Sequence, residues 1–110
     1  ERMAAAYEAN LAAFIAAVRR DLGLPGLPVV IGEIAPRRYD MARRRFEHAW
    51  RGTVQAAQRA VAGADPCAGL APAADLPQSD NLHFDTGGQL VLGRRMAAVF
   101  RRLAACREGS

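Results

Sequence analysis

The chain has 110 residues, of which 51% are hydrophobic and 24% are charged. This length fits one small domain or part of a larger one, and the hydrophobic content excludes a chain that is disordered by composition. The formal net charge is +4, all 15 basic residues are arginines, and 11 acids are interspersed with them. Nucleic-acid binding would need the arginines on one face, and their mixing with acids favours plain compositional bias, so we expect no nucleic-acid partner.

No apolar run is long enough to span a membrane and no signal peptide is visible, so we expect no membrane association. Cys67 and Cys106 form neither a multi-cysteine disulfide framework nor a Cys-x-x-Cys pair. Two interpretations stay open for them: one bridge, or two buried thiols. The chain begins without a Met and inside a helical pattern, from which we expect an N-terminal part of the same domain to lie outside it.

The first third of the chain predicts a helix followed by a strand. Residues 1–22 are Ala-rich, with apolar residues three and four apart, which indicates an amphipathic helix. These residues are Tyr7, Leu11, Phe14, Ile15, Val18 and Leu22. The stretch "GLPG" (23–26) ends the helix. "LPVVIGEIA" (27–35) is short, β-branched and continuously apolar, which predicts a strand buried in a parallel sheet.

Residues 36–51 are polar and dense in arginine, and we expect a surface loop with a helical turn or two. Three aromatics among the arginines, Tyr39, Phe46 and Trp50, could form a lid that faces a sugar or a nucleic acid. The simpler interpretation, which we favour, is a solvated loop with one anchoring aromatic. His48 is not expected to bind a metal, because its partners would have to come from distant parts of the chain.

The second half predicts a helix from Thr53 to Gly63, a weak strand over Ala68–Ala71, and a final helix over Thr86–Cys106. The expected buried stripe of the final helix is Leu90, Gly93, Ala97, Phe100, Leu103 and Ala104. Within that stripe, Gly93 is expected to mark a close contact between helix and sheet. Asp85, just before the helix, is expected to favour its dipole.

The alternation of helices and strands predicts an α/β fold in which helices cover a parallel sheet. Two strands are fewer than such sheets usually contain. We therefore expect residues 1–110 to be the C-terminal part of one larger α/β domain.

The loop before the final helix carries Asp80 and, three residues later, His83. Functional residues of parallel sheets collect on loops that follow the strands. An acid that binds one imidazole nitrogen leaves the other to act as a general base. Spacing alone favours a plainer alternative, in which the Asp caps a turn and the His fills a loop. Glu33, at the end of the first strand, is likewise either part of an active-site rim or, more commonly, a charge that ends a strand.

The stretch "DNLHFDTGGQLVLGRRMA" (80–97) resembles the last conserved block of the SGNH (GDSL-like) hydrolases, and most of all the branch of sialate O-acetylesterases and carbohydrate esterase family six. Two upstream stretches, "NLAAFIAAVRRDLGLPGLPVVIGEI" (10–34) and "VQAAQRAVA" (54–62), are also similar, with Gln58 at the family's Gln position. The resemblance covers nearly the whole chain, and residues 36–51 match least. It implies the C-terminal portion of a three-layer α/β/α, flavodoxin-like fold with parallel strands.

The resemblance also implies a serine esterase that removes acetyl groups from a sugar, either a sialic acid or a plant cell-wall polysaccharide. In such an enzyme a Ser attacks the ester, His83 takes its proton, Asp80 orients His83, and neither a cofactor nor a metal takes part. The resemblance is compatible with a secreted or periplasmic protein, and the sequence itself leaves the compartment unknown.

The family's nucleophile and oxyanion residues have no counterpart here. The only serines are Ser79 and Ser110, and neither stands in a nucleophile turn. We therefore expect this chain to be inactive alone and to associate with the missing N-terminal part or with further copies of itself. Two alternatives stay open: a non-catalytic, Arg-rich module that binds polyanions, and a degenerate hydrolase-like module used for interaction.

Overall fold

The computed structural model describes residues 2–35, 38–40, 42, 44–47, 50–80 and 82–108. In chain order its elements are α1 (Arg2–Leu22), β1 (Val29–Gly32), β2 (Arg38–Asp40), β3 (Arg45–Glu47), α2 (Arg51–Ala64), β4 (Ala68–Ala71), α3 (Thr86–Arg102) and α4 (Ala104–Glu108). The expected α/β class is confirmed.

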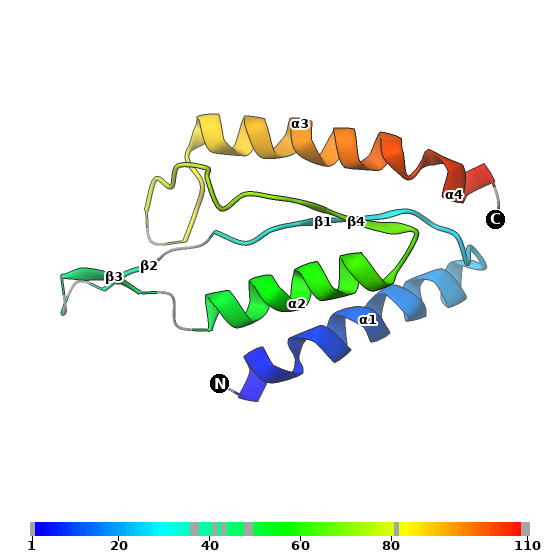
Figure 1. The fold of residues 1–110 in the computed structure, drawn as a ribbon, viewed down its shortest axis with the longest axis horizontal. Coiled ribbons are helices and arrows are strands. Elements are labelled where there is room, and N and C mark those ends of the chain that lie inside the picture. Colours follow the sequence, from blue (N-terminus) through cyan, green and yellow to red (C-terminus); the bar gives the residue numbers. More distant parts are fainter. Residues whose placement is uncertain are drawn as a thin grey trace.

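Strands β1 and β4 pair in parallel, from Val29 opposite Ala68 to Gly32 opposite Ala71. Helix α3 lies on one side of this pair, and α2 with α1 lies on the other, so the arrangement is three-layered (Figure 1). Because the strands are parallel, their carboxyl ends lie at the same edge of the sheet. The loop that leads to α3 starts at this edge. The layers and the parallel pairing agree with a part of an SGNH fold.

Each face of the strand pair has its own packing. On one face Ile31 of β1 packs with Ile15 of α1 and Val61 of α2 in a buried cluster. On the other face α3 approaches closely, since a Cβ at Gly69 would lie 2.5 Å from a methyl carbon of Val99. A larger residue at position 69 would therefore require the Val99 side chain or the helix to move.

The expected buried stripe of α3 is wrong. Gly93 faces open space, and Leu90 and Phe100 are 58% and 42% exposed. Of the expected residues, Leu103 does face the sheet. It does so with Leu92, Met96 and Val99, whose side chains lie where a Cβ on Gly32 or Gly69 would meet them. Both faces of this helix carry apolar residues, so periodicity could not choose between them.

The loop with helical turns expected over residues 36–51 is also wrong, because this segment contains the antiparallel strands β2 and β3. Their register places Arg38 opposite Glu47, Tyr39 opposite Phe46 and Asp40 opposite Arg45. The pair projects from the end of the molecule at which β1 terminates (Figure 1). His48 lies outside the described residues.

Gln58 of α2 satisfies the free edge of β1 at its carboxyl end. Its Oε1 accepts from the Ile34 N–H at 3.1 Å and its Nε2 donates to the Gly32 carbonyl at 3.3 Å. The intervening N–H of Glu33 points the other way and donates to Ala71 at 3.0 Å. A helix side chain thus makes the hydrogen bonds that a neighbouring strand would otherwise make.

Glu33 is a buried clamp at the ends of both strands. Its side chain is only 1% exposed. One oxygen accepts from the Ala73 N–H at 3.0 Å and the other from Arg59 Nη2 at 2.7 Å. The charge that ends the strand therefore joins β1, α2 and the start of the loop after β4.

Replacing this clamp should loosen the loop. We expect Glu33→Ala to lower the free energy of unfolding by about 2–4 kcal/mol, because it strands the buried Ala73 N–H. Glu33→Gln should cost less, since its amide oxygen still accepts from Ala73. Urea unfolding measures both, and equal losses for the two variants would contradict the clamp.

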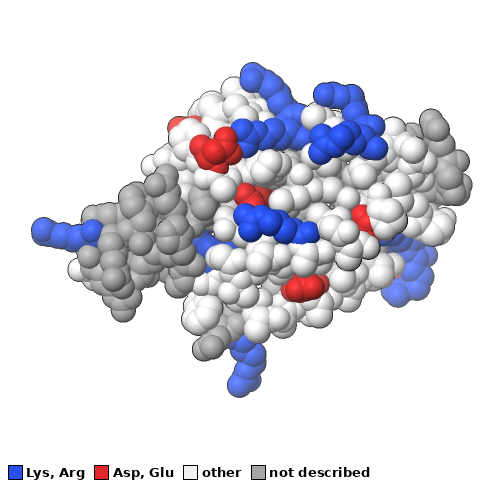
Figure 2. Space-filling view, viewed as in Figure 1, with Lys and Arg blue, Asp and Glu red and all other residues white. Residues whose placement is uncertain are grey.

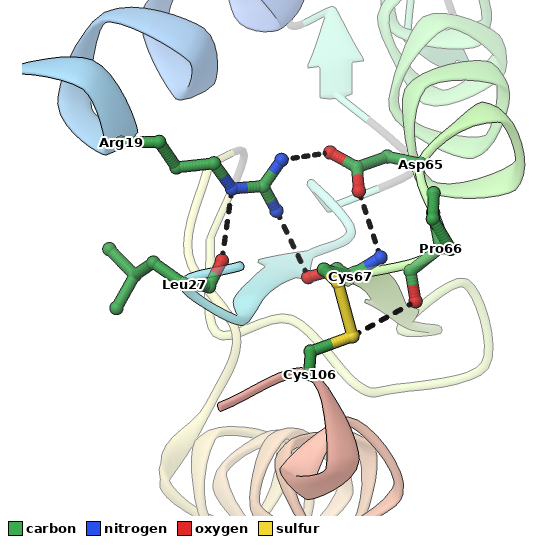
Figure 3. Close-up of a disulfide and its surroundings, with 6 residues drawn as sticks. All are labelled: Arg19, Leu27, Asp65, Pro66, Cys67 and Cys106. Carbon is green, nitrogen blue, oxygen red and sulfur yellow. Dashed lines mark hydrogen bonds and ion pairs between the residues drawn. A yellow bond between two sulfur atoms is a disulfide. The ribbon is translucent and has the colours of Figure 1, made fainter. Parts of the chain in front are cut away.

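The opposite end of the sheet is closed by a disulfide between Cys67 and Cys106, with their Cα atoms 5.7 Å apart (Figure 3). Of the two interpretations left open, the bridge is the one found. Arg19 donates to the Leu27 carbonyl at 3.0 Å and to the Cys67 carbonyl at 3.2 Å, and pairs with Asp65. Burial raises the pKa of Asp65, but the hydrogen bonds from Arg19 and the Cys67 N–H outweigh it, so the net pKa is lowered.

Removing the bridge should destabilise the fold without moving the loop at the other end. The bridge spans 39 residues, for which loop-closure entropy predicts a loss of about 3–4 kcal/mol in Cys67→Ser/Cys106→Ser. Urea unfolding of both proteins, with and without reductant, tests this. Reductant should affect only the wild type, and an unchanged unfolding midpoint in the double variant would refute it.

Candidate active site

Residues 78–84 form a small closed loop at the carboxyl end of the sheet. Gln78 and Phe84 form an antiparallel bridge, and the Ser79 N–H donates to the His83 carbonyl at 2.9 Å. The Asp85 N–H donates to the Pro77 carbonyl at 3.0 Å, which ties the loop to the start of α3. The main chain therefore holds both ends of the segment that carries Asp80 and His83.

The two oxygens of Asp80 have different partners. Oδ1 accepts from the N–H groups of Leu82 and His83, both at 2.7 Å, which is the hydrogen bonding of an Asx turn. Oδ2 lies 2.8 Å from Nδ1 of His83. The two interpretations of this motif are therefore compatible in geometry, since one carboxylate both caps the turn and contacts the imidazole.

The charge of Asp80 sets the tautomer of its partner. The hydrogen bond with His83, followed by those from the Leu82 and His83 amides, lowers the pKa of Asp80 from 3.8 to about 2. At neutral pH the carboxylate is ionised and can only accept, so a neutral His83 carries its proton on Nδ1 and leaves Nε2 as an acceptor. The His83 side chain is 68% exposed, so a substrate can reach it.

The start of α3 packs against the loop. Asp85 is the N-cap, and its side chain accepts from the Gly88 N–H at 2.7 Å. A Cβ on Gly88 would lie 2.9 Å from the Pro77 carbonyl oxygen, so glycine lets the helix start against the loop. The expected place of Asp85 at the helix N-terminus is confirmed, in the form of a capping hydrogen bond.

A hollow of about 550 Å³ lies beside the loop. Leu82 and Phe84, which flank His83 in sequence, line one part of it, and Gly32 and Glu33 at the end of β1 line another. Trp50 and Arg51, at the start of α2, also line the hollow. Sequence analysis placed Trp50 in the Arg-rich segment but had no signal for its proximity to Leu82 and Phe84.

Ser79 does not face the imidazole as a nucleophile would. Its hydroxyl lies 3.5 Å from the carbonyl oxygen of His83, a main-chain contact within the loop. Ser110 lies outside the described residues. Within the described ranges, His, Cys, Asp and Glu form no group of three or more that could hold a metal ion, and no helix there has the length and apolarity to cross a membrane.

Comparison with known proteins identifies the class. The family model described as carbohydrate esterase, sialic acid-specific acetylesterase, matches residues 1–102. The chain therefore belongs to this family of carbohydrate esterases, which confirms the suspected sialate O-acetylesterase relationship. No curated protein and no solved structure matches the chain.

Asp80→Asn should abolish the single tautomer of His83. The amide oxygen of Asn accepts a weaker hydrogen bond from Nδ1–H than a carboxylate does, and it carries no charge that would hold the imidazole. Imidazole-optimised ¹H–¹⁵N NMR at pH 8 should show an Nδ1–H signal in the wild type that is lost in Asp80→Asn. Asp85→Asn is the control, because Asn caps a helix as well as Asp does.

The same Nδ1–H signal should survive acidification. The pKa of Asp80 is lowered in the fold, so the carboxylate's contribution to loop order is complete above about pH 4 and is lost as pH falls toward about 2. A wild type without the Nδ1–H signal at pH 8 would contradict the proposed tautomer.

Proposed function

We propose that the protein is a serine esterase that removes acetyl groups from a carbohydrate, with His83 as its general base and Asp80 as the residue that orients it. One observation carries this proposal: Oδ2 of Asp80 lies 2.8 Å from Nδ1 of an exposed His83, on a closed loop after a parallel strand. The family match supplies the substrate class.

The geometry suits the two proton transfers of ester hydrolysis. Nε2 of His83 takes the proton of a serine hydroxyl as that oxygen attacks the acetyl carbonyl carbon, and then gives it to the departing sugar oxygen. Water is activated in the same way to release acetate. The ionised Asp80 keeps the ring in place and stabilises the imidazolium at each step.

The nucleophile is proposed to lie outside residues 1–110, in an N-terminal part of the same domain. Of the two serines in the sequence, Ser79 has its hydroxyl near a main-chain oxygen of its own loop, and Ser110 is the last residue and does not stand in a nucleophile motif. On the edge of β1 that faces away from β4, the main chain around Val30 could pair with a further strand. Further along the same edge, Gln58 binds the Gly32 carbonyl. Residues 1–110 alone should therefore lack esterase activity.

A fluorophosphonate probe, which reacts with activated serines, tests this assignment. We expect it to label a serine outside residues 1–110 in the full-length protein, and His83→Ala to reduce the labelling rate at least about 10³-fold. The separate 110-residue chain should stay unlabelled. Arg94→Ala, an exposed change on α3, should label like the wild type. Labelling at Ser79, or no labelling of the full-length protein, would overturn the proposal.

Binding of a polyanion is the second candidate, and one observation favours it. Basic side chains gather along the edge of the molecule formed by α3 (Figure 2), which carries Arg94, Arg95, Arg101 and Arg102. Arg95, however, already makes a bidentate pair with Asp75 at 2.6 and 2.7 Å and lowers the pKa of that acid to about 2. Anion binding with a steep salt dependence would distinguish this candidate from the esterase.

A further inference from the structure

The hollow beside the loop that carries His83 has the size and the lining of a ligand site. Its volume of about 550 Å³ lies within the usual range for small-molecule sites. Leu82 and Phe84 line it from either side of His83 in sequence. A ligand in the hollow would therefore lie against the loop that carries the candidate base.

Trp50 is held toward this hollow in an uncommon backbone conformation. Its φ of 60° and ψ of −18° place it in the left-handed region, which bulky residues rarely occupy. The following turn fixes it there, since the Val54 N–H donates to the Trp50 carbonyl at 3.0 Å and Arg51 donates to the Ala35 carbonyl at 2.8 Å. The side chain is nevertheless 51% exposed. A strained residue that leaves a large aromatic face in solvent indicates a surface kept for binding.

We propose that Trp50 is the stacking platform of a sugar-binding site formed by this hollow, on which the pyranose ring of the acetylated substrate lies while its ester reaches His83. This inference rests on the proposed esterase function and adds the residue that selects the substrate. The C–H face of a pyranose is apolar and matches the face of an indole, and Leu82 and Phe84 extend the apolar surface toward the base.

The charges around the hollow fit a neutral or an acidic sugar. Arg51 is one of its lining residues and brings a positive charge, and its guanidinium donates to the Ala35 carbonyl at 2.8 Å. Among the described lining residues, the carboxylate is that of Glu33, which is buried and paired with Arg59 and the Ala73 N–H. An acidic sugar would therefore meet a positive group without an uncompensated negative one.

The single tryptophan of the chain reports on this site directly. The Trp50 fluorescence, taken in the full-length protein as the difference between wild type and Trp50→Phe, is followed during titration with two probes. These are an O-acetylated sialic acid methyl glycoside and an O-acetylated xylo-oligosaccharide, both added to the His83→Ala background to prevent turnover. We expect saturable quenching by at least one probe, and the preferred probe identifies the sugar as acidic or neutral.

Calorimetric titration of variants then tests the platform. We expect Trp50→Ala to weaken binding of the preferred probe about tenfold, and Trp50→Phe, which keeps a ring and the same backbone demands, to weaken it less than threefold. Phe14→Ala removes another exposed aromatic, 66% exposed on α1 against 51% for Trp50, from outside the hollow and should bind like the wild type. In an otherwise wild-type enzyme, Trp50→Ala should raise KM for the sugar ester far more than it lowers kcat.

The outcomes separate this inference from the esterase proposal. Quenching of Trp50 without any hydrolysis would retain the sugar site and reject the esterase. Hydrolysis of the sugar ester that is indifferent to Trp50→Ala, with no Trp50 quenching, would overturn the platform and leave the esterase in place.

Discussion

Parallel pairing of β1 with β4 is the constraint on which the other features depend. It brings the carboxyl ends of both strands to one edge of the sheet, and the candidate catalytic residues and the hollow both follow these ends. The loop after β4 carries Asp80 and His83, and the residues after β1 line the hollow beside them. Had the strands run antiparallel, the two groups would lie at opposite ends of the molecule.

Two side chains form hydrogen bonds with the main chain at the carboxyl ends of the short strands. Gln58 occupies the outer edge of β1 at Gly32 and Ile34, and Glu33 holds the start of the next loop through Ala73. Both residues are buried and polar, and both are fully engaged in hydrogen bonds. They position the end of β1, and with it the site, by direct contact with the main chain and not by general hydrophobic packing.

The sequence predicts the α/β class and the parallel strands from local patterns. It predicts the Asp80–His83 pair from the resemblance of residues 80–97 to a known family, since the spacing alone favoured a turn cap and a loop residue. It does not predict which face of α3 is buried, since apolar residues repeat at the same interval on both sides. The β2–β3 pair was missed because arginine content obscured a cross-strand pattern in residue types. The sequence could not predict that Trp50 and Leu82 line the same hollow, because this arises only when α2 and the loop after β4 pack at the same edge of the sheet.

The disulfide encloses the candidate site in a covalent ring that runs from Cys67 through β4, the loop and α3 to Cys106. Asp80 and His83 lie on an exposed loop of this ring, and exposed loops are preferred sites of proteolytic cleavage. A single cut there would break the main chain but leave one covalent molecule, with α3 still anchored beside β4. The fold therefore presents its reactive loop openly while the rest of the layer survives damage to it.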